Sequence, residues 1–357
     1  MKTTLFLSNC TLIFLLVASC VCFKCSCSNN QGITTEETSK PDDVFEEGTQ
    51  PTYSIEDFKS ALPESKYYQQ TPTVLNISST EEDLILRCAS VDNAPLEAPR
   101  VPKISNLRAL FSDSILIPVI FHVVHSSTGV GKVDSVVIEN QVSLMNQIYG
   151  EVNIRFVHET RYIENNKYFN SGVNQSTYEE DDASIEMKKE LREDPENTLN
   201  IYVTSCKNAL GYATFPWDID SSPESTMIDG VVIRYTSLPG ESQTNYNEGK
   251  TVIHEIGHYL GLWHTFEGGC KGGDEVEDTP PQRSHTSGCP KERDSCPQHN
   301  GLDPIHNYMD YSFDTCMTEF TQGQINRMHW AVVTFRANFV NNSDIVNLEL
   351  QPIADML

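Results

Sequence analysis

The sequence predicts an α+β fold: a twisted mixed sheet with one backing helix and one helix that carries a histidine motif, then an irregular region that ends in a helix. The first observation is a near-continuous apolar run, Ile115–Val124, which is typical of a central strand. The second is the helical spacing of the apolar residues that follow it, Ile138, Val142, Met145 and Tyr149. Further strands are expected near Asn153–Val157, Leu199–Thr204 and Met227–Arg234.

The beginning of the chain has the composition of a secretion signal. Lys2 precedes a short apolar core at Leu12–Ala18, and small residues follow that core. The core is too short to span a bilayer, and no later run approaches the ~18 apolar residues that spanning requires. We therefore expect a secreted protein. A lipid anchor at Cys20 is the alternative, because Val17–Cys20 resembles a bacterial lipoprotein cleavage site.

An acidic, proline-containing stretch separates this signal from the folded part. Residues 28–100 hold 14 acidic and 5 basic side chains with little periodicity, so they are typical of a linker or pro-segment. The expected organisation is a signal peptide at 1–19, a linker and pro-segment at 20–100, a folded domain at 101–345 and a tail at 346–357. Within the folded domain, an N-terminal subdomain is expected to reach about residue 261 and a C-terminal one to begin at 262.

The overall charge excludes two classes of partner. The chain carries 50 acidic and 25 basic side chains, which gives a formal net charge of −25. A surface of this sign repels nucleic acids and anionic membranes, so we expect neither as a partner.

The most informative stretch of the chain reads TVIHEIGHYLGLWHTF and begins at Thr251. On a helix, His254 and His258 lie one turn apart and present both imidazoles to a single metal ion. Glu255 lies about 100° further round the helix, beside the metal, where it can act as a base. A glycine, Gly261, allows the helix to end in a left-handed residue, so that His264 can return as a third ligand. Three imidazoles leave one zinc coordination position for water, which is typical of a catalytic site.

The turn NYMDYS follows this motif and places Met309 about forty-five residues after His264. The sequence thereby resembles the metzincins, whose long histidine motif is paired with a methionine turn. Within that clan it resembles the pappalysin family, and especially its secreted fungal-type and ulilysin-like members. Four more segments carry the resemblance: GYATFPW (Gly211–Trp217), DEVEDTP (Asp274–Pro280), DPIHNYMDYSFDTC (Asp303–Cys316) and FTQGQINRM (Phe320–Met328).

The resemblance implies a metzincin-type zinc endopeptidase that acts on protein or peptide substrates. A zinc-activated water would attack the peptide bond, with Glu255 as general base and then general acid. Tyr311 matches a zinc-proximal tyrosine of related enzymes and would help to stabilise the oxyanion. The substrate would extend along the strand near Gly211–Phe215. The alternatives are a zinc hydrolase of a non-peptide amide and a catalytically silent binding module on the same fold.

The region after the histidine helix has little apolar core, so cross-links or metals must hold it. Four cysteines, Cys270, Cys289, Cys296 and Cys316, allow three disulfide pairings, and a second zinc site is the alternative. The resemblance favours the pairs Cys270–Cys296 and Cys289–Cys316. It also implies a calcium site in the same region.

Two further features of this region are expected. Asp274, Asp278 and Thr279 offer oxygen atoms for the calcium ion, although a solvated acidic turn would have the same composition. The last helix is expected to begin at Thr321, which forms a capping box with Gln324. Its expected buried stripe consists of Ile325, Met328, Val332 and Phe335.

One cysteine lies in the stretch that precedes the folded domain. A thiolate is a strong zinc ligand, so Cys88 can occupy the fourth position and keep a zymogen latent. Similar family members carry an Arg-Cys pair here, matched by Arg87 and Cys88. A disulfide from Cys88 to Cys206 is the alternative. Activation of the zymogen would require cleavage between Cys88 and Ile115. Near the methionine turn, Asp314 would favour a substrate with a basic side chain.

Overall fold

A computed structural model describes residues 85–90, 114–219 and 225–340. These residues belong to a single unit of the chain. No helix among them is long and apolar enough to cross a membrane. The expected signal peptide, the alternative anchor at Cys20 and the tail at 346–357 all lie outside the described residues.

A five-stranded mixed sheet forms the N-terminal half, with the strand order β2-β1-β3-β5-β4. The strands are β1 (Ile115–His125), β2 (Ile154–Glu164), β3 (Leu199–Thr204), β4 (Gly211–Ala213) and β5 (Val231–Arg234). Parallel pairing joins β2, β1, β3 and β5, whereas β4 runs antiparallel to β5 and forms one edge of the sheet. The expected strand near Gly211–Phe215 is therefore present at an edge and is shorter than expected.

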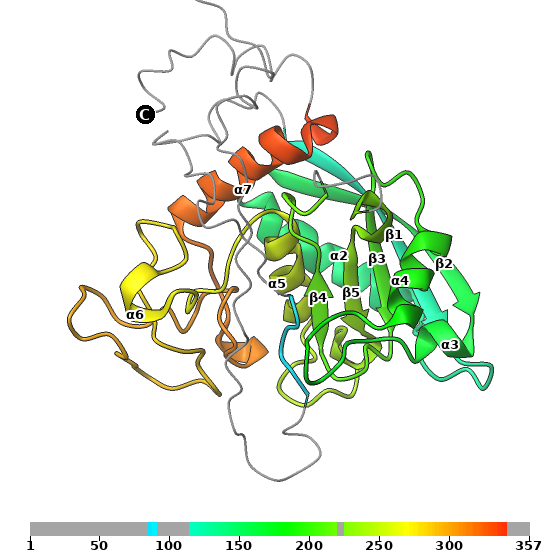
Figure 1. Cartoon of the computed structure of the whole chain (residues 1–357), viewed down its shortest axis with the longest axis horizontal. Helices are drawn as coiled ribbons and strands as arrows, with labels where there is room; N and C mark the ends of the chain where they lie inside the picture. Colours follow the sequence, from blue (N-terminus) through cyan, green and yellow to red (C-terminus); the bar gives the residue numbers. More distant parts are fainter. Residues whose placement is uncertain (1–84, 91–113, 220–224, 341–357) are drawn as a thin grey trace, which may run out of the picture. The chain divides into compact units, whose positions relative to one another are not determined.

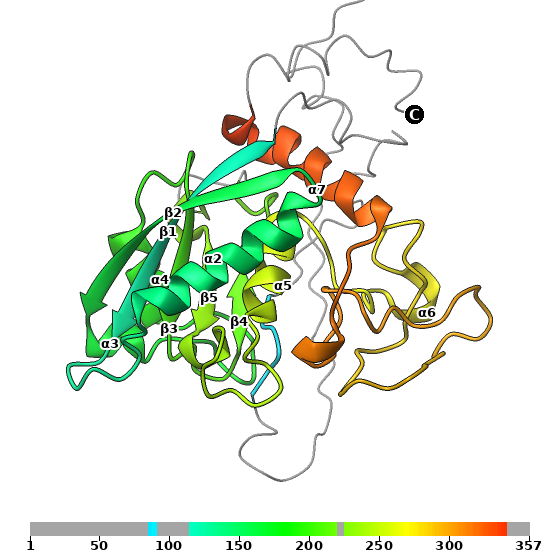
Figure 2. The same cartoon turned by 180° about the vertical axis from the view of Figure 1, so that it is seen from behind.

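Helices cover both faces of this sheet. Figure 2 shows α2 (Ser135–Gly150) lying across one face, next to α5 (Lys250–Tyr259), the helix that carries the histidine motif. Figure 1 shows α3 (Asn166–Phe169) and α4 (Asp182–Leu191) on the opposite face. Apolar side chains of β3 alternate between the two faces, because Ile201 and Val203 join one buried cluster and Tyr202 joins the other. The two expected helices are present, and sequence periodicity missed α3 and α4.

The expected strand at Met227–Arg234 is wrong in its first half. Only Val231–Arg234 is extended, and Met227 lies in a 3₁₀ turn, Ser225–Ile228. Gly230 separates the two parts with a φ of 125°, which side-chain-bearing residues rarely adopt. The interruption therefore follows from the backbone conformation at this glycine. The expected strand at Leu199–Thr204 agrees with β3 in full.

The chain between α5 and α7 (Gln322–Phe335) is irregular, as the sequence predicts, and contains only the short helix α6 (Gly269–Gly272) and one 3₁₀ turn, Asp314–Cys316. Thr321 caps α7 in a capping box with Gln324. Met328 and Val332 are buried, whereas Ile325 and Phe335 are only partly buried. The buried surface of α7 is thus wider than the expected stripe, because polar residues such as Arg327 and His329 are buried as well.

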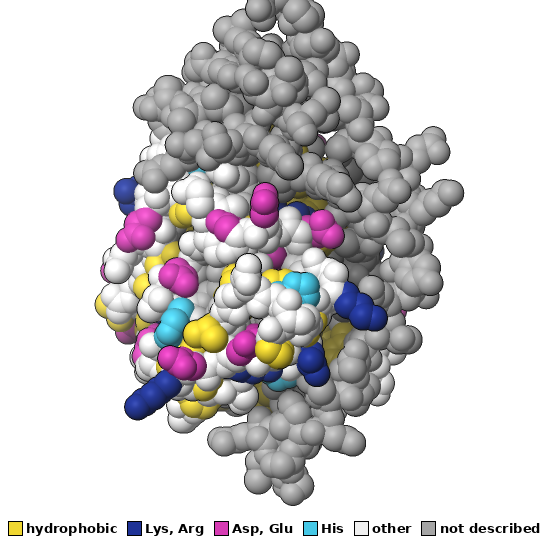
Figure 3. All heavy atoms as spheres, turned by 90° about the vertical axis from the view of Figure 1, so that its left-hand side faces the viewer, with side chains coloured by type: hydrophobic (Ala, Val, Ile, Leu, Met, Phe, Trp, Pro, Cys, Tyr) yellow, Lys and Arg dark blue, Asp and Glu magenta, His cyan; other side chains and the backbone are white. Residues whose placement is uncertain are grey.

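Two disulfides hold the irregular region. Cys270 is joined to Cys296 and Cys289 to Cys316, which is the pairing that the resemblance implies. Figure 3 shows the outer face of this region, where acidic and basic side chains are interspersed and apolar side chains form only small groups. Without an extensive apolar core, the region depends on its cross-links.

We expect loss of one disulfide to destabilise this region selectively. Each cross-link closes a loop of 26 or 27 residues, and a loop of this size contributes about 3 kcal/mol to the free energy of unfolding. The double variant Cys270→Ser with Cys296→Ser should unfold at lower denaturant concentration, and proteases should cut it faster between residues 262 and 321. Four free thiols in the native protein, or a second stoichiometric zinc, would contradict this account.

Candidate metal and active site

Helix α5 presents His254 and His258 from a fully buried face. The Nδ1 atom of His254 lies 2.7 Å from the carbonyl oxygen of Tyr308, and that of His258 lies 2.7 Å from the carbonyl oxygen of Leu262. A carbonyl oxygen only accepts hydrogen bonds, so each Nδ1 must carry the proton. Each Nε2 is therefore left with a lone pair.

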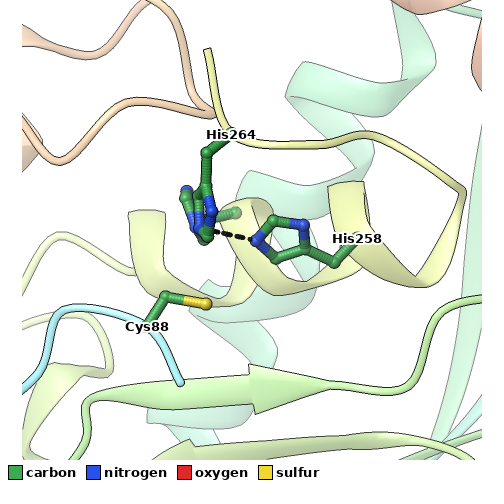
Figure 4. Close-up of side chains that lie close together, drawn as sticks. Cys88, His258 and His264 are labelled. Carbon is green, nitrogen blue, oxygen red and sulfur yellow. Dashed lines mark hydrogen bonds between the residues drawn. The ribbon is translucent and has the colours of Figure 1, made fainter. Parts of the chain in front are cut away.

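The third histidine returns to the same point after the helix ends. Gly261 has a φ of 90°, as the sequence predicts, and the chain turns back through Leu262 to His264. His258 Nε2 lies 3.1 Å from His254 Nε2 and 3.0 Å from His264 Nε2. Figure 4 shows the rings of His258 and His264 pointing toward each other.

These three imidazoles fit a zinc ion. Lone pairs that face each other at this distance repel unless a cation lies between them, and bonds of about 2.0–2.1 Å at tetrahedral angles place nitrogen ligands roughly 3.3–3.4 Å apart. Burial lowers the pKa of His258 to about 4 and also lowers the pKa values of His254 and His264. The rings are therefore neutral at physiological pH, which is the form that binds metals.

The methionine turn packs directly beneath α5. Met309 is fully buried, and its sulfur lies so close to Gly257 that a Cβ atom there would come within 2.4 Å of it. The carbonyl oxygen of Met309 accepts a hydrogen bond from the Thr265 backbone at 3.2 Å. The preceding residue, Tyr308, accepts the hydrogen bond that orients His254, and Thr265 directly follows His264. The methionine turn therefore supports two of the three histidines.

Glu255 is fully buried and lies close to the edge strand β4. A Cβ atom at Gly211 would come within 2.9 Å of Glu255 Oε1, so only glycine lets the strand approach this closely. Burial raises the pKa of Glu255 to about 8, and its neighbours Cys88, Arg87 and Ser90 oppose that rise. The Glu255 side chain is thus buried beside the histidine helix face with its neutral form favoured.

Tyr311 lies in the same site. Its hydroxyl is 3.2 Å from His264 Nε2, and it donates a hydrogen bond to the Cys88 carbonyl oxygen at 3.3 Å. Its ring stands almost perpendicular to that of His264, with the centroids 5.0 Å apart. The hydroxyl is therefore close enough to a group bound at the histidines to donate a hydrogen bond to it.

Residues 86–90 lie alongside the edge strand. Leu86 forms a parallel bridge with Ala209, the Leu210 amide donates to the Leu86 carbonyl at 2.9 Å, and the Ala89 amide donates to the Gly211 carbonyl at 3.0 Å. These contacts resemble the way in which an extended peptide adds to a sheet edge. The segment thereby lies along the edge on which an extended substrate is expected.

Cys88 faces the histidines from this segment (Figure 4). Its sulfur and one nitrogen of each of the three histidines all lie within 4.8 Å of one another. The thiol also donates to Glu255 Oε2 at 3.4 Å, and the Ser90 hydroxyl donates to the same oxygen at 3.0 Å. Cys88 and Cys206 are both free thiols, so the alternative disulfide between them is not formed.

Arg87 extends into a pocket beside the site. Its guanidinium group lies 3.4 Å from Asp314 Oδ1 and 4.8 Å from the centre of the Tyr246 ring, and it donates to the hydroxyl of Thr251. Asp314 is buried, and its other oxygen accepts a hydrogen bond from the Glu248 amide at 2.9 Å. The pocket thus combines a carboxylate with an aromatic face, which suits a cationic side chain.

The acidic loop provides a second group of oxygen atoms. Asp274 Oδ2 and Thr279 Oγ1 are buried, and neither makes a hydrogen bond of good geometry with a described residue. Burial raises the pKa of Asp274 to about 7. Asp278 Oδ2 accepts a hydrogen bond from the Gly323 amide at 2.9 Å near the start of α7. Asp274 and Thr279 are therefore the residues of this loop whose buried oxygen atoms lack a hydrogen-bond partner of good geometry among the described residues.

Sequence reasoning missed Gln282, whose side chain is fully buried behind the site. Its Oε1 accepts a hydrogen bond from the Thr265 hydroxyl at 2.8 Å, and its Nε2 donates to Asp310 Oδ1 at 3.1 Å. Gln282 thus joins the residue after His264 to the methionine turn. No local pattern in the sequence points to it, because the two partners that join these segments are 17 and 28 residues away.

Comparisons with known proteins agree with this site. The family model described as pregnancy-associated plasma protein-A, a peptidase family, matches residues 180–333. An extracellular metalloprotease of Neurospora crassa is 48% identical over 230 residues, which cover 63% of this chain and 77% of that protein.

Two solved structures are also similar to this chain. Promirolysin of Tannerella forsythia, in a mutant form, has a TM-score of 0.53 at 26% identity, covering 71% of this chain and 90% of that one. Mature mirolysin of the same organism, in complex with a cleaved peptide, has a TM-score of 0.52 at 27% identity, covering 68% and 100%. Together with the histidine motif and the methionine turn, these likenesses show that the chain is a metalloendopeptidase of the pappalysin family, within the metzincins.

Proposed function

We propose that the protein is a secreted zinc endopeptidase that is made as a latent zymogen. The observation that carries the proposal is the convergence of three neutral imidazoles, whose Nε2 atoms lie 3.0 and 3.1 Å apart. When bound, zinc supplies a Lewis acid that activates water and polarises the scissile carbonyl. The name of the Neurospora crassa relative, an extracellular metalloprotease, supports secretion.

In this proposal Glu255 moves the proton. Its carboxylate would take a proton from the attacking water and deliver it to the leaving amine, as general base and then general acid. Tyr311 would donate a hydrogen bond to the oxyanion, since its hydroxyl lies 3.2 Å from His264 Nε2. Once residues 86–90 are released, the edge of β4 would bind the backbone of the substrate peptide. The backbone contact of residues 86–90 with this strand supports that role.

Glu255→Gln is expected to lower turnover by roughly 10²–10⁴-fold or more while zinc remains bound. The amide keeps the shape of the side chain but cannot accept the proton. Metal analysis and digestion of a protein substrate by the activated enzyme test this together. Near-normal cleavage by the variant would rule out the proposed role.

Tyr311→Phe is the comparison, and it should lower turnover by ~10²-fold through loss of one oxyanion donor. Unchanged turnover would assign Tyr311 to packing alone.

The pocket that holds Arg87 supports a preference for a basic side chain next to the scissile bond. Asp314 is buried. The charged form of a buried carboxylate is costly, and a cation that pairs with it strongly lowers that cost. Burial raises the pKa of Asp314, and the charge of Arg87 opposes that rise. A substrate arginine or lysine in the same place would supply the same compensation.

Asp314→Asn should remove this preference. In a peptide library, the activated wild-type enzyme is expected to favour peptides with arginine or lysine beside the cleaved bond. The variant should lose roughly 10-fold or more in kcat/KM on such peptides, because one extra charge pair is worth more than ~1.4 kcal/mol in a desolvated site. Cleavage of peptides with a neutral residue there should change little. Retention of the wild-type preference would contradict this assignment.

Latency is proposed to depend on Cys88. Its thiol lies among the three histidines and beside Glu255, where it would exclude water from the site. Because residues 86–90 also occupy the edge of β4, one segment would block both the metal and the peptide groove. Cleavage between Cys88 and Ile115 would release the segment and expose both.

The zymogen with Cys88→Ala is expected to show premature activity and self-cleavage. Cys206→Ala is the matched control, because among the described residues it removes the other free buried thiol, which is not part of the cluster with the histidines, and it should remain latent. N-terminal sequencing of protein from the culture medium locates the signal and activation cleavages. A latent Cys88→Ala zymogen of normal stability, or a Cys88–Cys206 disulfide in the purified protein, would overturn the switch.

We also propose a calcium ion at Asp274 and Thr279. Calcium prefers carboxylate and other oxygen ligands, and these two buried side chains present such oxygens without internal partners of good geometry. Calcium bound only to the native state would add RT ln(1 + [Ca²⁺]/Kd) to its stability. The proposal therefore predicts that the melting temperature of the protein depends on calcium.

Calcium should raise the melting temperature of the wild-type protein and leave that of Asp274→Asn unchanged. Asp278→Asn is the control, since Asp278 instead contacts the first turn of α7 through the Gly323 amide. This control should melt lower at all calcium concentrations and still respond to calcium. The absence of any calcium response in the wild-type protein would refute the site.

A further inference from the structure

Arg327 of α7 is fully buried and reaches the turn that follows the histidine helix. Its Nε–H donates to the Gly261 carbonyl oxygen at 2.7 Å. Gly261 has a φ of 90° and packs tightly against α7, because a Cβ atom there would lie 2.9 Å from Ala331. Arg327 therefore fixes the first peptide of the segment that returns the chain to His264.

The same guanidinium group also holds the end of that segment. It lies 4.4 Å from the centre of the Trp263 ring and 5.9 Å from that of Trp217. Trp263 directly precedes His264 and is itself buried. Cation–π attraction is strongest in such desolvated surroundings. The three residues from Gly261 to Trp263 are thus held at both ends by one side chain.

The positive charge of Arg327 also acts on the acidic loop. Asp274, whose pKa burial raises, lies near enough for the positive charge of Arg327 to oppose that rise. The loop itself is attached to the start of α7 through Asp278 and Gly323. A buried guanidinium is costly unless such groups compensate it.

We propose that Arg327 is a positioning residue for the third metal ligand, His264. This inference rests on the proposed zinc site. His264 reaches the metal only through the turn at 261–263, because it lies beyond the end of α5. By bonding to Gly261 and stacking on Trp263, Arg327 limits the positions that the His264 ring can take. Outer-shell groups that orient a ligand typically change metal affinity by 10–100-fold.

A second arginine of α7 provides the control. Arg336 donates to the Tyr259 carbonyl at 3.2 Å, lies 3.4 Å from the Tyr259 ring centre and pairs with Asp229 at 2.8 and 3.0 Å. It therefore holds the last turn of α5 and does not touch the segment 261–263. Arg336→Lys should lower the thermal stability of the protein and weaken metal binding less than Arg327→Lys does, because His258 is held within the helix and by its own hydrogen bond to Leu262.

The test compares Arg327→Lys with Arg336→Lys in the full-length zymogen loaded with Co²⁺. Metal affinity is measured by competition with a chelator, and ligand geometry by the visible absorption of the bound Co²⁺. We expect Arg327→Lys to bind the metal at least ~10-fold more weakly and to show an altered spectrum. Arg336→Lys should stay closer to the wild type than Arg327→Lys in both affinity and spectrum. Should Arg327→Lys not fold, Trp263→Phe replaces it, with a smaller loss in the same direction.

Failure of the Arg327 proposal and failure of the zinc proposal give different results. If Arg327→Lys, or Trp263→Phe in its place, has the metal affinity and spectrum of the wild type, the positioning role of Arg327 is overturned. The proposed zinc site would remain intact in that case. Failure of the wild-type protein to bind the metal at all would instead refute the proposed function on which the inference rests.

Discussion

The site depends on the two hydrogen bonds that orient His254 and His258. Each Nδ1 donates to a backbone carbonyl at 2.7 Å, so each Nε2 must face the same point with a lone pair. The two carbonyls belong to Tyr308 in the methionine turn and Leu262 in the turn after α5. Ligand geometry therefore depends on segments that are far apart in the sequence. Gln282 bonds to the methionine turn through Asp310, and Arg327 bonds to the turn after α5 through Gly261, so each contacts one of these segments.

One short segment contacts both the edge of β4 and the histidine cluster in the described structure. Residues 86–90 pair with β4, and Cys88 lies within 4.8 Å of the histidine nitrogens. Because the same backbone edge would bind a substrate, the pro-segment and a substrate would exclude each other. Arg87 extends this overlap to the pocket of Asp314. A single cleavage would then free the groove, the pocket and the metal together, and latency would need no separate conformational change in the folded domain.

Local patterns predicted the parts of this structure that local forces determine. The spacing of His254, His258 and Gly261 fixes a helix face and its end, and β3 is apolar enough to be buried on both sides, as all six of its residues are. The strand expected from Met227 was wrong because Gly230 has a positive φ, and because the neighbouring Asp229 binds Arg336, 107 residues away. Helix α4 was missed, since its buried side includes Lys188, which pairs with Glu180. Contacts of this kind leave no periodic signal in the sequence.

X-ray absorption at the zinc edge of the full-length secreted protein tests the central claim most directly. It distinguishes sulfur from nitrogen and oxygen ligands, recognises imidazole rings by their outer-shell scattering, and does not rely on activity. The account predicts one zinc per chain, bound by three nitrogen atoms and one sulfur, with the sulfur lost and replaced by oxygen after the pro-segment is removed. No stoichiometric zinc, or a zinc bound by four sulfur atoms, would contradict it.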